Sequence, residues 1–382
     1  MDTNVSTAAL DFQTLHEVVR AARARLSDHL WGYVVGGADT ETTVARNRQA
    51  LDSVALRPRV LRDVRSIDTG RDFLGRAMRM PVMLAPIGGL EQLEAGGAAT
   101  VVRAAAAFGV PAMVSSVTHP NLEGTAEAAP DGFRMYQLYV RGDQAWMDDQ
   151  AERAIAAGYH AFCFTVDTAV YSRRERDIAG RFSKPWRRGA TASGMDFQAG
   201  LNWEHVRRFK DQYRIPLIIK GIATAEDAII ACDHGVEVVY VSNHGGRQLD
   251  HGRGTLDVLP EVLEAVRGRA KVIIDGGFMR GTDVVKAIAL GADLVGIGRL
   301  YGLGMSAAGE AGILRVLELL EEEIRGTMGL LGATKMDALN GSFLHRAMPV
   351  GLPHVLSAFP LLHPSEVPPT MGPAGDRPPS EG

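Results

Sequence analysis

The sequence lacks several signals that would place it in other classes of protein. No stretch approaches eighteen uninterrupted apolar residues, so we expect no transmembrane helix. The first residues, MDTNVSTAALDFQ, are polar and acidic, whereas an export signal is basic and then apolar. The formal net charge is -4, so the basic field that a nucleic-acid or membrane-surface protein needs is missing. We therefore expect a soluble protein of the cytoplasm.

Metal and dinucleotide motifs are missing too. The two cysteines, Cys163 and Cys232, have no CxxC spacing and lie in apolar or helical stretches, as is typical of small buried side chains in a reducing compartment. There is no HExxH and no spaced set of Cys and His residues, so we expect no metal site. No GxGxxG follows a predicted strand, which excludes a dinucleotide bound in the Rossmann manner.

Eight short apolar runs, each closed by small or polar residues, recur along the chain. They cover residues 80–86, 111–116, 134–140, 161–167, 216–221, 238–243, 271–277 and 294–299. Runs of this kind suit strands that are buried on both faces, as in a parallel sheet. Helical patterns alternate with them, at 97–108, 224–235 and 281–291, and the longest amphipathic segment, 309–332, follows the last run. This alternation predicts a (β/α)8 TIM barrel; a doubly wound sheet is the alternative, but it rarely has eight strands in one series.

The remaining segments surround this barrel. Residues 12–50 have helical patterns and predict an N-terminal helical extension that covers the barrel bottom or rim. Residues 181–204 show neither pattern, which is typical of a lid or binding loop. Residues 1–10 are expected to be flexible, and the Pro/Gly-rich tail at 363–382 to be disordered. One domain, at 11–362, remains.

In a TIM barrel the active site lies at the C-terminal ends of the strands, so polar residues that close the predicted strands are site candidates. Each of them alone could simply face solvent at a turn. Together they require a ligand, because polar groups that converge on one mouth lose hydration. The candidates are Gln137, Tyr139, Thr165, Asp167, Lys220, Ser242, His244, Asp275 and Arg299.

The last two predicted strands end in IIDGGFMRG (273–281) and GIGR (296–299). Barrel enzymes commonly bind phosphate there, although the glycines could also be only tight turns. Lys220 places a charge in an apolar run and needs an anionic or electron-rich partner. A flavin fits, since a cation beside the ring stabilises its reduced, anionic form.

The stretch VSNHGGRQLD (241–250) contains the strongest catalytic candidates. His244 is a candidate general base, and Asp167 could orient it. Gly245 and Gly246 keep the backbone thin where a flat ring must approach. Arg247 offers a planar fork that suits a carboxylate.

A second fork could come from Arg173 or Arg174, in TAVYSRRERD after the fourth predicted strand. The alternative is that both arginines belong to a solvated basic loop.

These strings together resemble a known family. SNHGGRQLD, TVDTxxxxRRExDI (165–178), LIIKGI, IDGGxxRGTDVxKAxALGA (274–292) and IGR are similar to the FMN-dependent 2-hydroxy-acid oxidising enzymes, which include glycolate oxidase, lactate oxidase, mandelate dehydrogenase and flavocytochrome b2. The resemblance runs from about residue 12 to 350. It implies a barrel that binds FMN, commonly as a tetramer, and that oxidises a 2-hydroxy acid to a 2-oxo acid.

The resemblance also implies roles for individual positions. His244 matches the base and Asp167 its partner, and Tyr33, Tyr139, Arg174 and Arg247 match the substrate ligands. The flavin contacts would be Pro86, Ile87, Gly88, Ser115, Gln137, Thr165, Lys220 and Ser242. The ribityl and phosphate contacts would be Asp275, Gly276, Gly277, Arg280, Gly298 and Arg299.

The chain departs from the family pattern at four places. Met279 stands where a phosphate-binding arginine is usual, although Arg280 follows it. Val117 replaces an aromatic residue, and Gly88 stands where short-chain oxidases often have alanine. The 181–204 loop is short and has no apolar membrane insert. These departures favour a soluble enzyme whose substrate is bulkier than glycolate.

The leading interpretation is an oxidase that uses O2 and gives H2O2. The same chemistry with a quinone or protein acceptor, or with an amine or modified peptide as substrate, is the alternative. An FMN barrel that isomerises its substrate without net redox is a third, but it would not need a histidine with two carboxylate-binding arginines. A non-enzymatic binder fits least.

Overall fold

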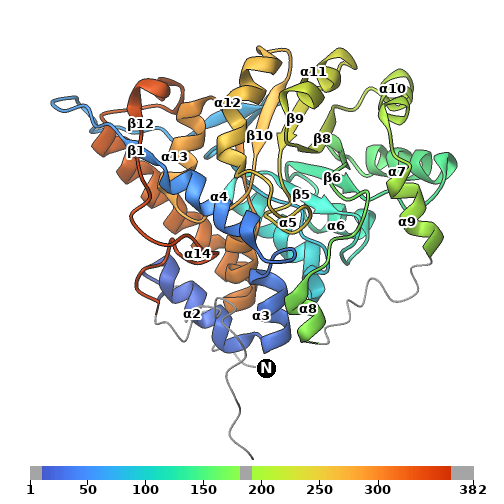
Figure 1. The fold of residues 1–382 in the computed structure, drawn as a ribbon, viewed down its shortest axis with the longest axis horizontal. Coiled ribbons are helices and arrows are strands. Elements are labelled where there is room, and N and C mark those ends of the chain that lie inside the picture. Colours follow the sequence, from blue (N-terminus) through green and yellow to red (C-terminus); the bar gives the residue numbers. More distant parts are fainter. Residues whose placement is uncertain (1–10, 181–191, 363–382) are drawn as a thin grey trace, which may run out of the picture.

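The computed structural model describes residues 11–180 and 192–362, with only the backbone of 192–194. Its centre is a closed barrel of eight parallel strands, in which sequential neighbours pair and the last strand returns to the first (Figure 1). The predicted (β/α)8 fold is confirmed, and all the barrel strands but β8 are shorter than the predicted apolar runs. The strands are β4 (Val82–Leu84), β5 (Ala112–Ser115), β6 (Arg134–Leu138), β7 (Ala161–Thr165), β8 (Leu217–Ile222), β9 (Val238–Val241), β10 (Lys271–Ile274) and β11 (Leu294–Ile297).

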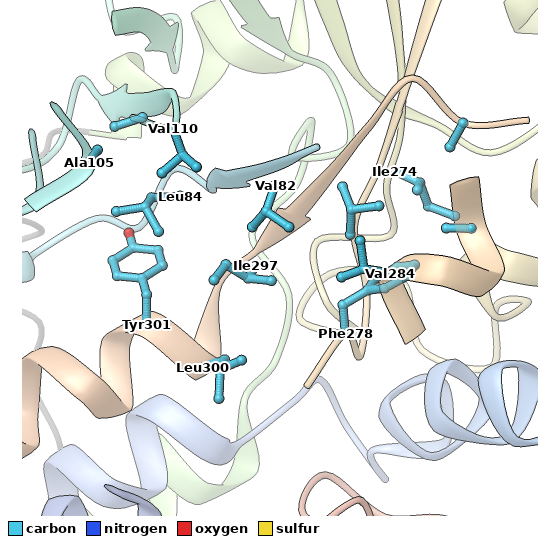
Figure 2. Packing of buried hydrophobic residues seen from close by; sticks show 14 of the residues in the cluster. Val82, Leu84, Ala105, Val110, Ile274, Phe278, Val284, Ile297, Leu300 and Tyr301 are labelled. Atoms are coloured by element: carbon cyan, nitrogen blue, oxygen red, sulfur yellow. The ribbon is translucent and has the colours of Figure 1, made fainter. Parts of the chain in front are cut away.

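The strands are apolar throughout because both of their faces are buried. Inside the barrel, Met83, Met135 and Ile273 belong to one hydrophobic cluster. Outside it, Leu84 and Ile297 pack against the helices, and Figure 2 shows Tyr301 beside them. The Tyr301 hydroxyl donates to the Ala85 carbonyl (2.8 Å), so the buried ring has a partner for its polar end.

The helices around the barrel follow the predicted alternation. They are α5 (Gly97–Phe108), α6 (Leu122–Ala128), α7 (Gln144–Ala156), α8 (Glu175–Ala179), α9 (Ala192–Ala199), α10 (Trp203–Gln212), α11 (Ala225–Asp233), α12 (Thr255–Val266), α13 (Gly281–Leu290) and α14 (Arg299–Leu331). The last one begins ten residues before the predicted start at 309. It contains a kink, because Ala308 and Gly309 have non-helical backbone angles.

Two predictions about the remaining segments need correction or stay open. The segment 181–204 was expected to lack helices, but α9 and the start of α10 lie within it. Residues 181–191, like the termini at 1–10 and 363–382, lie outside the described residues.

Two small sheets were not predicted. One pairs β1 (Val54–Leu56) with β12 (Leu344–Arg346), and the other pairs β2 (Arg71–Phe73) with β3 (Arg76–Met78). Phe73 and Met78 join the cluster inside the barrel, so the second hairpin closes its N-terminal end. Each strand has three residues, too short for a periodic pattern to appear in the sequence.

The N-terminal extension forms the predicted helices α2 (Leu15–Arg25), α3 (Asp28–Val35) and α4 (Thr42–Asp52). α2 packs along α14, and α3 and α4 reach the rim at the C-terminal ends of the strands (Figure 1). There the Ala38 amide donates to the Gly246 carbonyl (2.9 Å). Among the described helices, none is long and apolar enough to cross a membrane.

Asp250, six residues after His244, caps helix α4 from outside. Its carboxylate accepts from the Thr43 amide (2.7 Å), the Thr40 amide (3.0 Å) and the Thr40 hydroxyl (2.8 Å). Burial alone would raise the pKa of Asp250, but the bonds from Thr43 and Thr40 outweigh it and lower the pKa to about 2. The loop that follows β9 therefore holds the start of α4 through the ionised carboxylate of Asp250.

We predict that Asp250→Asn lowers the free energy of unfolding by about 1–3 kcal/mol at pH 7, because the amide group meets backbone donors. The pKa in the folded protein is depressed, so this stabilisation is complete above the unfolded-state pKa near ~4 and is lost as pH falls toward about 2. Urea unfolding at several pH values measures both. Asp143→Asn is the control, since Asp143 caps α7 through one local bond (3.0 Å). A pH-independent difference, or one equal to the control, would contradict the prediction.

Candidate active site

The C-terminal strand ends surround a cavity of about 510 Å³, within the usual range for small-molecule sites. Most of the residues that the sequence predicted for the site line it. These are Tyr33, Pro86, Ile87, Gly88, Tyr139, Arg174, Lys220, His244, Arg247, Asp275, Gly276, Gly277, Gly298 and Arg299. The strand-end candidates therefore come together in one cavity at the predicted end of the barrel.

Four predicted cofactor residues, Ser115, Gln137, Thr165 and Ser242, are buried at the strand ends and do not belong to the lining. They support each other and the lining residues. Gln137 Nε2 donates to Thr165 Oγ1 (2.8 Å), and Lys220 Nζ donates to Ser242 Oγ (2.9 Å).

Arg280 is the predicted cofactor residue that the structure places elsewhere. Its guanidinium pairs with Glu323 on α14 (2.6 Å) and donates to the Ala358 carbonyl (3.1 Å), outside the cavity lining. A carboxylate and a backbone carbonyl thus hold the Arg280 side chain away from the cavity lining, where the sequence had placed it as a phosphate contact. Met279, which has no charge, lines the cavity instead.

His244, Gly245 and Gly246 form one left-handed turn, with φ angles of 58°, 64° and 76°. Glycine adopts this conformation without strain, whereas His244 does so against its preference. A Cβ on Gly246 would lie 2.7 Å from the Val44 nitrogen of α4, and a Cβ on Gly245 would lie 2.8 Å from Arg299 Nη1. The positive φ angles and the close neighbours therefore both require glycine at 245 and 246. The sequence had suggested a different reason, the approach of a flat flavin ring.

Hydrogen bonds hold this turn from both sides. The His244 amide donates to Ser242 Oγ (3.1 Å), and the Gly246 amide donates to the Asn243 carbonyl (3.0 Å). The side-chain amides of Asn243 and Asn47 form two hydrogen bonds with each other, in which each Nδ2 donates to the other residue's Oδ1 (2.7 and 3.0 Å). Asn47 lies on α4 and is 1% exposed. Sequence reasoning missed Asn47, whose only signal is an amide inside an amphipathic helix.

The predicted catalytic pair is in contact. His244 Nδ1 lies 2.9 Å from Asp167 Oδ1, and Nε2 lies 3.1 Å from the Tyr139 hydroxyl. Burial lowers the pKa of His244, although Asp167 opposes the shift. Burial would raise the pKa of Asp167, but His244 and Lys220 lower it overall. An ionised carboxylate only accepts, so we assign the imidazole proton to Nδ1 and a lone pair to Nε2.

Tyr139 completes this arrangement. Burial raises the pKa of Tyr139 far above its ordinary value, so its hydroxyl stays protonated and donates to His244 Nε2.

Of the two arginines that follow β7, the structure brings Arg174 to the cavity and leaves Arg173 exposed, paired with Glu175. Burial and the nearby Arg247 lower the pKa of Arg174. Two cations that converge on one cavity repel each other, and an anion between them would relieve the repulsion. The pair therefore favours a ligand with a carboxylate.

Gln248 and two backbone carbonyls orient these arginines. Gln248 accepts from Arg174 Nη2 (3.3 Å) and donates to the Asp167 carbonyl (3.1 Å). Arg247 Nη1 donates to the carbonyls of Tyr33 (2.7 Å) and Gly36 (2.8 Å), at the end of α3. Sequence reasoning had not assigned a role to Gln248.

The strand ends also fit the flavin part of FMN. Gln137 Oε1 and Asp167 Oδ2 are buried without a hydrogen-bond partner among the described residues, which is uncommon for polar atoms. Lys220 supplies a buried cation on the cavity wall. Gly276 and Gly277, at φ angles of 108° and 83°, line the same cavity with backbone that has no side chains.

For a phosphate, the N-terminus of α14 is more suitable than that of α13. Asp283 already accepts from the amides of Met279 (3.0 Å) and Arg280 (3.1 Å), so a carboxylate occupies the start of α13. Gly298, the N-cap of α14, lines the cavity and has no side chain to compete for its amides.

Arg299, beside that N-cap, has other contacts as well. It donates to the carbonyls of Gly36 (2.8 Å), Gly245 (2.8 Å) and Val34 (3.1 Å). Burial, and next Arg247, lower its pKa to about 9.

Comparisons with known proteins show the family of the chain. Residues 22–346 match the model of the FMN-dependent dehydrogenase family. L-lactate oxidase of a Nostoc species is 35% identical over 355 residues, which cover 87% of this chain and 97% of that protein. Glycolate oxidase 3 of Arabidopsis thaliana is 36% identical over 371 residues, covering 91% and 100%. A crystal structure of mandelate oxidase with (S)-2-phenylpropionate has a TM-score of 0.82 at 37% identity, covering 89% of this chain and 100% of that one. The chain belongs to the FMN-dependent dehydrogenase family, and its cofactor is FMN.

Proposed function

We propose that this enzyme oxidises an (S)-2-hydroxy acid to the 2-oxo acid, that O2 accepts the electrons and becomes H2O2, and that the substrate is bulkier than glycolate. FMN-dependent oxidation of a 2-hydroxy acid is the activity of the lactate, glycolate and mandelate oxidases to which the chain is similar. The observation that carries the proposal is the neutral His244, paired with a buried carboxylate beside two arginines in one cavity.

Arg174 and Arg247 bind the substrate carboxylate in this proposal. Both line the cavity, and both guanidinium groups are fixed by backbone carbonyls and by the ring faces of Tyr171 (4.7 Å) and Tyr33 (4.8 Å). A fixed planar fork loses little entropy when a carboxylate binds. The carboxylate would hold the neighbouring α-carbon and its hydroxyl close to His244.

His244 Nε2 then takes the proton of the substrate hydroxyl. The imidazolium that forms is stabilised by Asp167, 2.9 Å away on Nδ1. FMN supplies the acceptor for the two electrons that leave the α-carbon with its hydrogen. The substrate thus loses its C–H and O–H hydrogens, and O2 gains two electrons and two protons to give H2O2.

One wall of the cavity supports a substrate bulkier than glycolate. A Cβ on Gly88 would lie 2.6 Å from Val117 Cγ2, so these two positions share the same space. Leu93 and Val140 continue an apolar lining there. A small residue at 88 and an aliphatic one at 117 support a branched or aryl substituent, which an apolar wall accommodates.

We further propose that the enzyme works in the cytoplasm, as its composition and charge favour, and as a homotetramer, as the family resemblance implies. The alternative is a dehydrogenase that passes its electrons to a quinone or a protein, or that acts on an amine or a modified peptide. The lactate, glycolate and mandelate oxidases to which the chain is similar support O2 as the acceptor.

The first experiment tests substrate and acceptor together. We expect anaerobic bleaching of bound FMN by mandelate or phenyllactate to be faster than by glycolate, with lactate between them. Mixing the reduced enzyme with air should reoxidise it at least as fast as it turns over. Reoxidation far slower than turnover would exclude the oxidase, and no bleaching by any 2-hydroxy acid would exclude the substrate class.

In Gly88→Ala, where the new methyl meets Val117, the substrate preference in the same bleaching measurement should move toward glycolate.

The second experiment tests Asp167. We expect Asp167→Asn to slow flavin reduction by about 10²- to 10⁴-fold, because the imidazolium loses its counter-charge. In the wild type the rate should fall as pH drops through a His244 pKa below its ordinary value. Asp167 raises that pKa, so the variant's acid limb should move to lower pH. Asp148→Asn, which breaks a surface pair with Arg208, is the control. An acid limb at higher pH, or a rate within twofold, would contradict this role.

A further inference from the structure

Tyr240 is a buried polar residue that the proposed mechanism does not use. It lies on β9 with its side chain inside the barrel, fully buried among apolar residues such as Met135 and Ile218. A Cβ on Gly296 of β11 would lie 2.5 Å from the Tyr240 hydroxyl oxygen. The glycine in that strand therefore makes room for the hydroxyl group.

The Tyr240 hydroxyl forms a hydrogen bond with a carboxylate. Tyr240 donates to Asp275 Oδ2 (2.9 Å), and Ser242 donates to Asp275 Oδ1 (2.7 Å). Burial, and next Asp275 itself, raise the pKa of Tyr240 far above its ordinary value, so the hydroxyl remains a donor. Each oxygen of Asp275 thus holds one hydroxyl.

Lys220 stands next to this pair. Its ammonium donates to Ser242 Oγ (2.9 Å), but it lies 3.9 Å from Asp275 Oδ2 and 4.0 Å from Asp167 Oδ2, beyond hydrogen-bond distance from both. Lys220 is also 5.3 Å from the centre of the Tyr240 ring. The oxygen of Asp275 that is nearest to the ammonium is the one that the Tyr240 hydroxyl occupies.

Removing the hydroxyl would leave a buried carboxylate oxygen without its donor. Such an atom is costly to leave unsatisfied, and Lys220 is the nearest cation that could satisfy it. The ammonium would then move toward Asp275 Oδ2, from 3.9 Å to hydrogen-bond distance. A closer carboxylate offsets more of the ammonium charge, so the attraction of Lys220 for another charge in the cavity would weaken.

We propose that Tyr240 is a positioning residue which, by satisfying Asp275 Oδ2, keeps the Lys220 ammonium from pairing with Asp275 and thereby raises the reduction potential of bound FMN. A cation beside the flavin ring stabilises its reduced, anionic form. This inference rests on the FMN dependence of the family and goes beyond the proposed function, since it needs neither a particular substrate nor O2.

The test is the midpoint potential of FMN bound to Tyr240→Phe, measured by equilibration with a reference dye. At a given potential, the ratio of reduced to oxidised FMN should fall about tenfold, a midpoint about 30 mV more negative for a two-electron couple. Gly296→Ala breaks the same bond from the other side, because its methyl displaces the hydroxyl, and it should lower the ratio in the same direction.

Tyr136→Phe is the matched control. It removes another buried tyrosine hydroxyl, which donates to Gln150 Oε1 (2.8 Å), and should lose stability without changing the potential. A ratio within twofold of the wild type in Tyr240→Phe or in Gly296→Ala would overturn the inference. So would a more positive potential, or an equal shift in the control. None of these outcomes depends on substrate oxidation, so they remain separate from failure of the proposed function.

Discussion

The left-handed turn at residues 244–246 is the constraint on which the rest of the site depends. It places the imidazole and the Arg247 guanidinium on the same cavity, at the price of an unfavourable φ angle for a histidine. Helix α4 holds the turn through Asn47 and Val44, and Asp250, from the end of the same loop, holds the start of α4. The stretch SNHGGRQLD therefore both carries the reactive groups and anchors the helix that positions them.

A second constraint is the alternation of charge across the strand ends. His244, Asp167, Lys220 and Asp275 follow one another within 2.9 to 4.0 Å, so each buried charge has an opposite or polar neighbour. Asp167 lies between the imidazole and the ammonium, and it can therefore serve the base and the cofactor cation together. Tyr240 and Ser242 satisfy the carboxylate at the other end of this row. The network explains how a barrel interior that is otherwise apolar tolerates these charges.

The sequence predicts those features that residues near one another in the chain determine, and misses those that depend on residues far apart in the chain. Strands such as 134–138 and helix 97–108 follow from local patterns, and the site residues follow from the family resemblance. Asn47 and Asp250 could not be assigned, because each acts on residues about 200 positions away. The position of Arg280 outside the cavity lining could not be predicted for the same reason, since Glu323, with which it pairs, belongs to a helix that the local motif does not include. Gly245 and Gly246 were expected to be needed, but the residues that leave no room for a side chain there lie in α4 and at Arg299.

The central claim is that the turn presents His244 as the base of the reaction. The most direct measurement is anaerobic stopped-flow reduction of bound FMN in His244→Gln, with the 2-hydroxy acid that reduces the wild type fastest. The variant should retain FMN, because the cofactor side of the cavity is unchanged, and its reduction should be at least about a thousandfold slower. Reduction within tenfold of the wild-type rate would show that another group takes the proton.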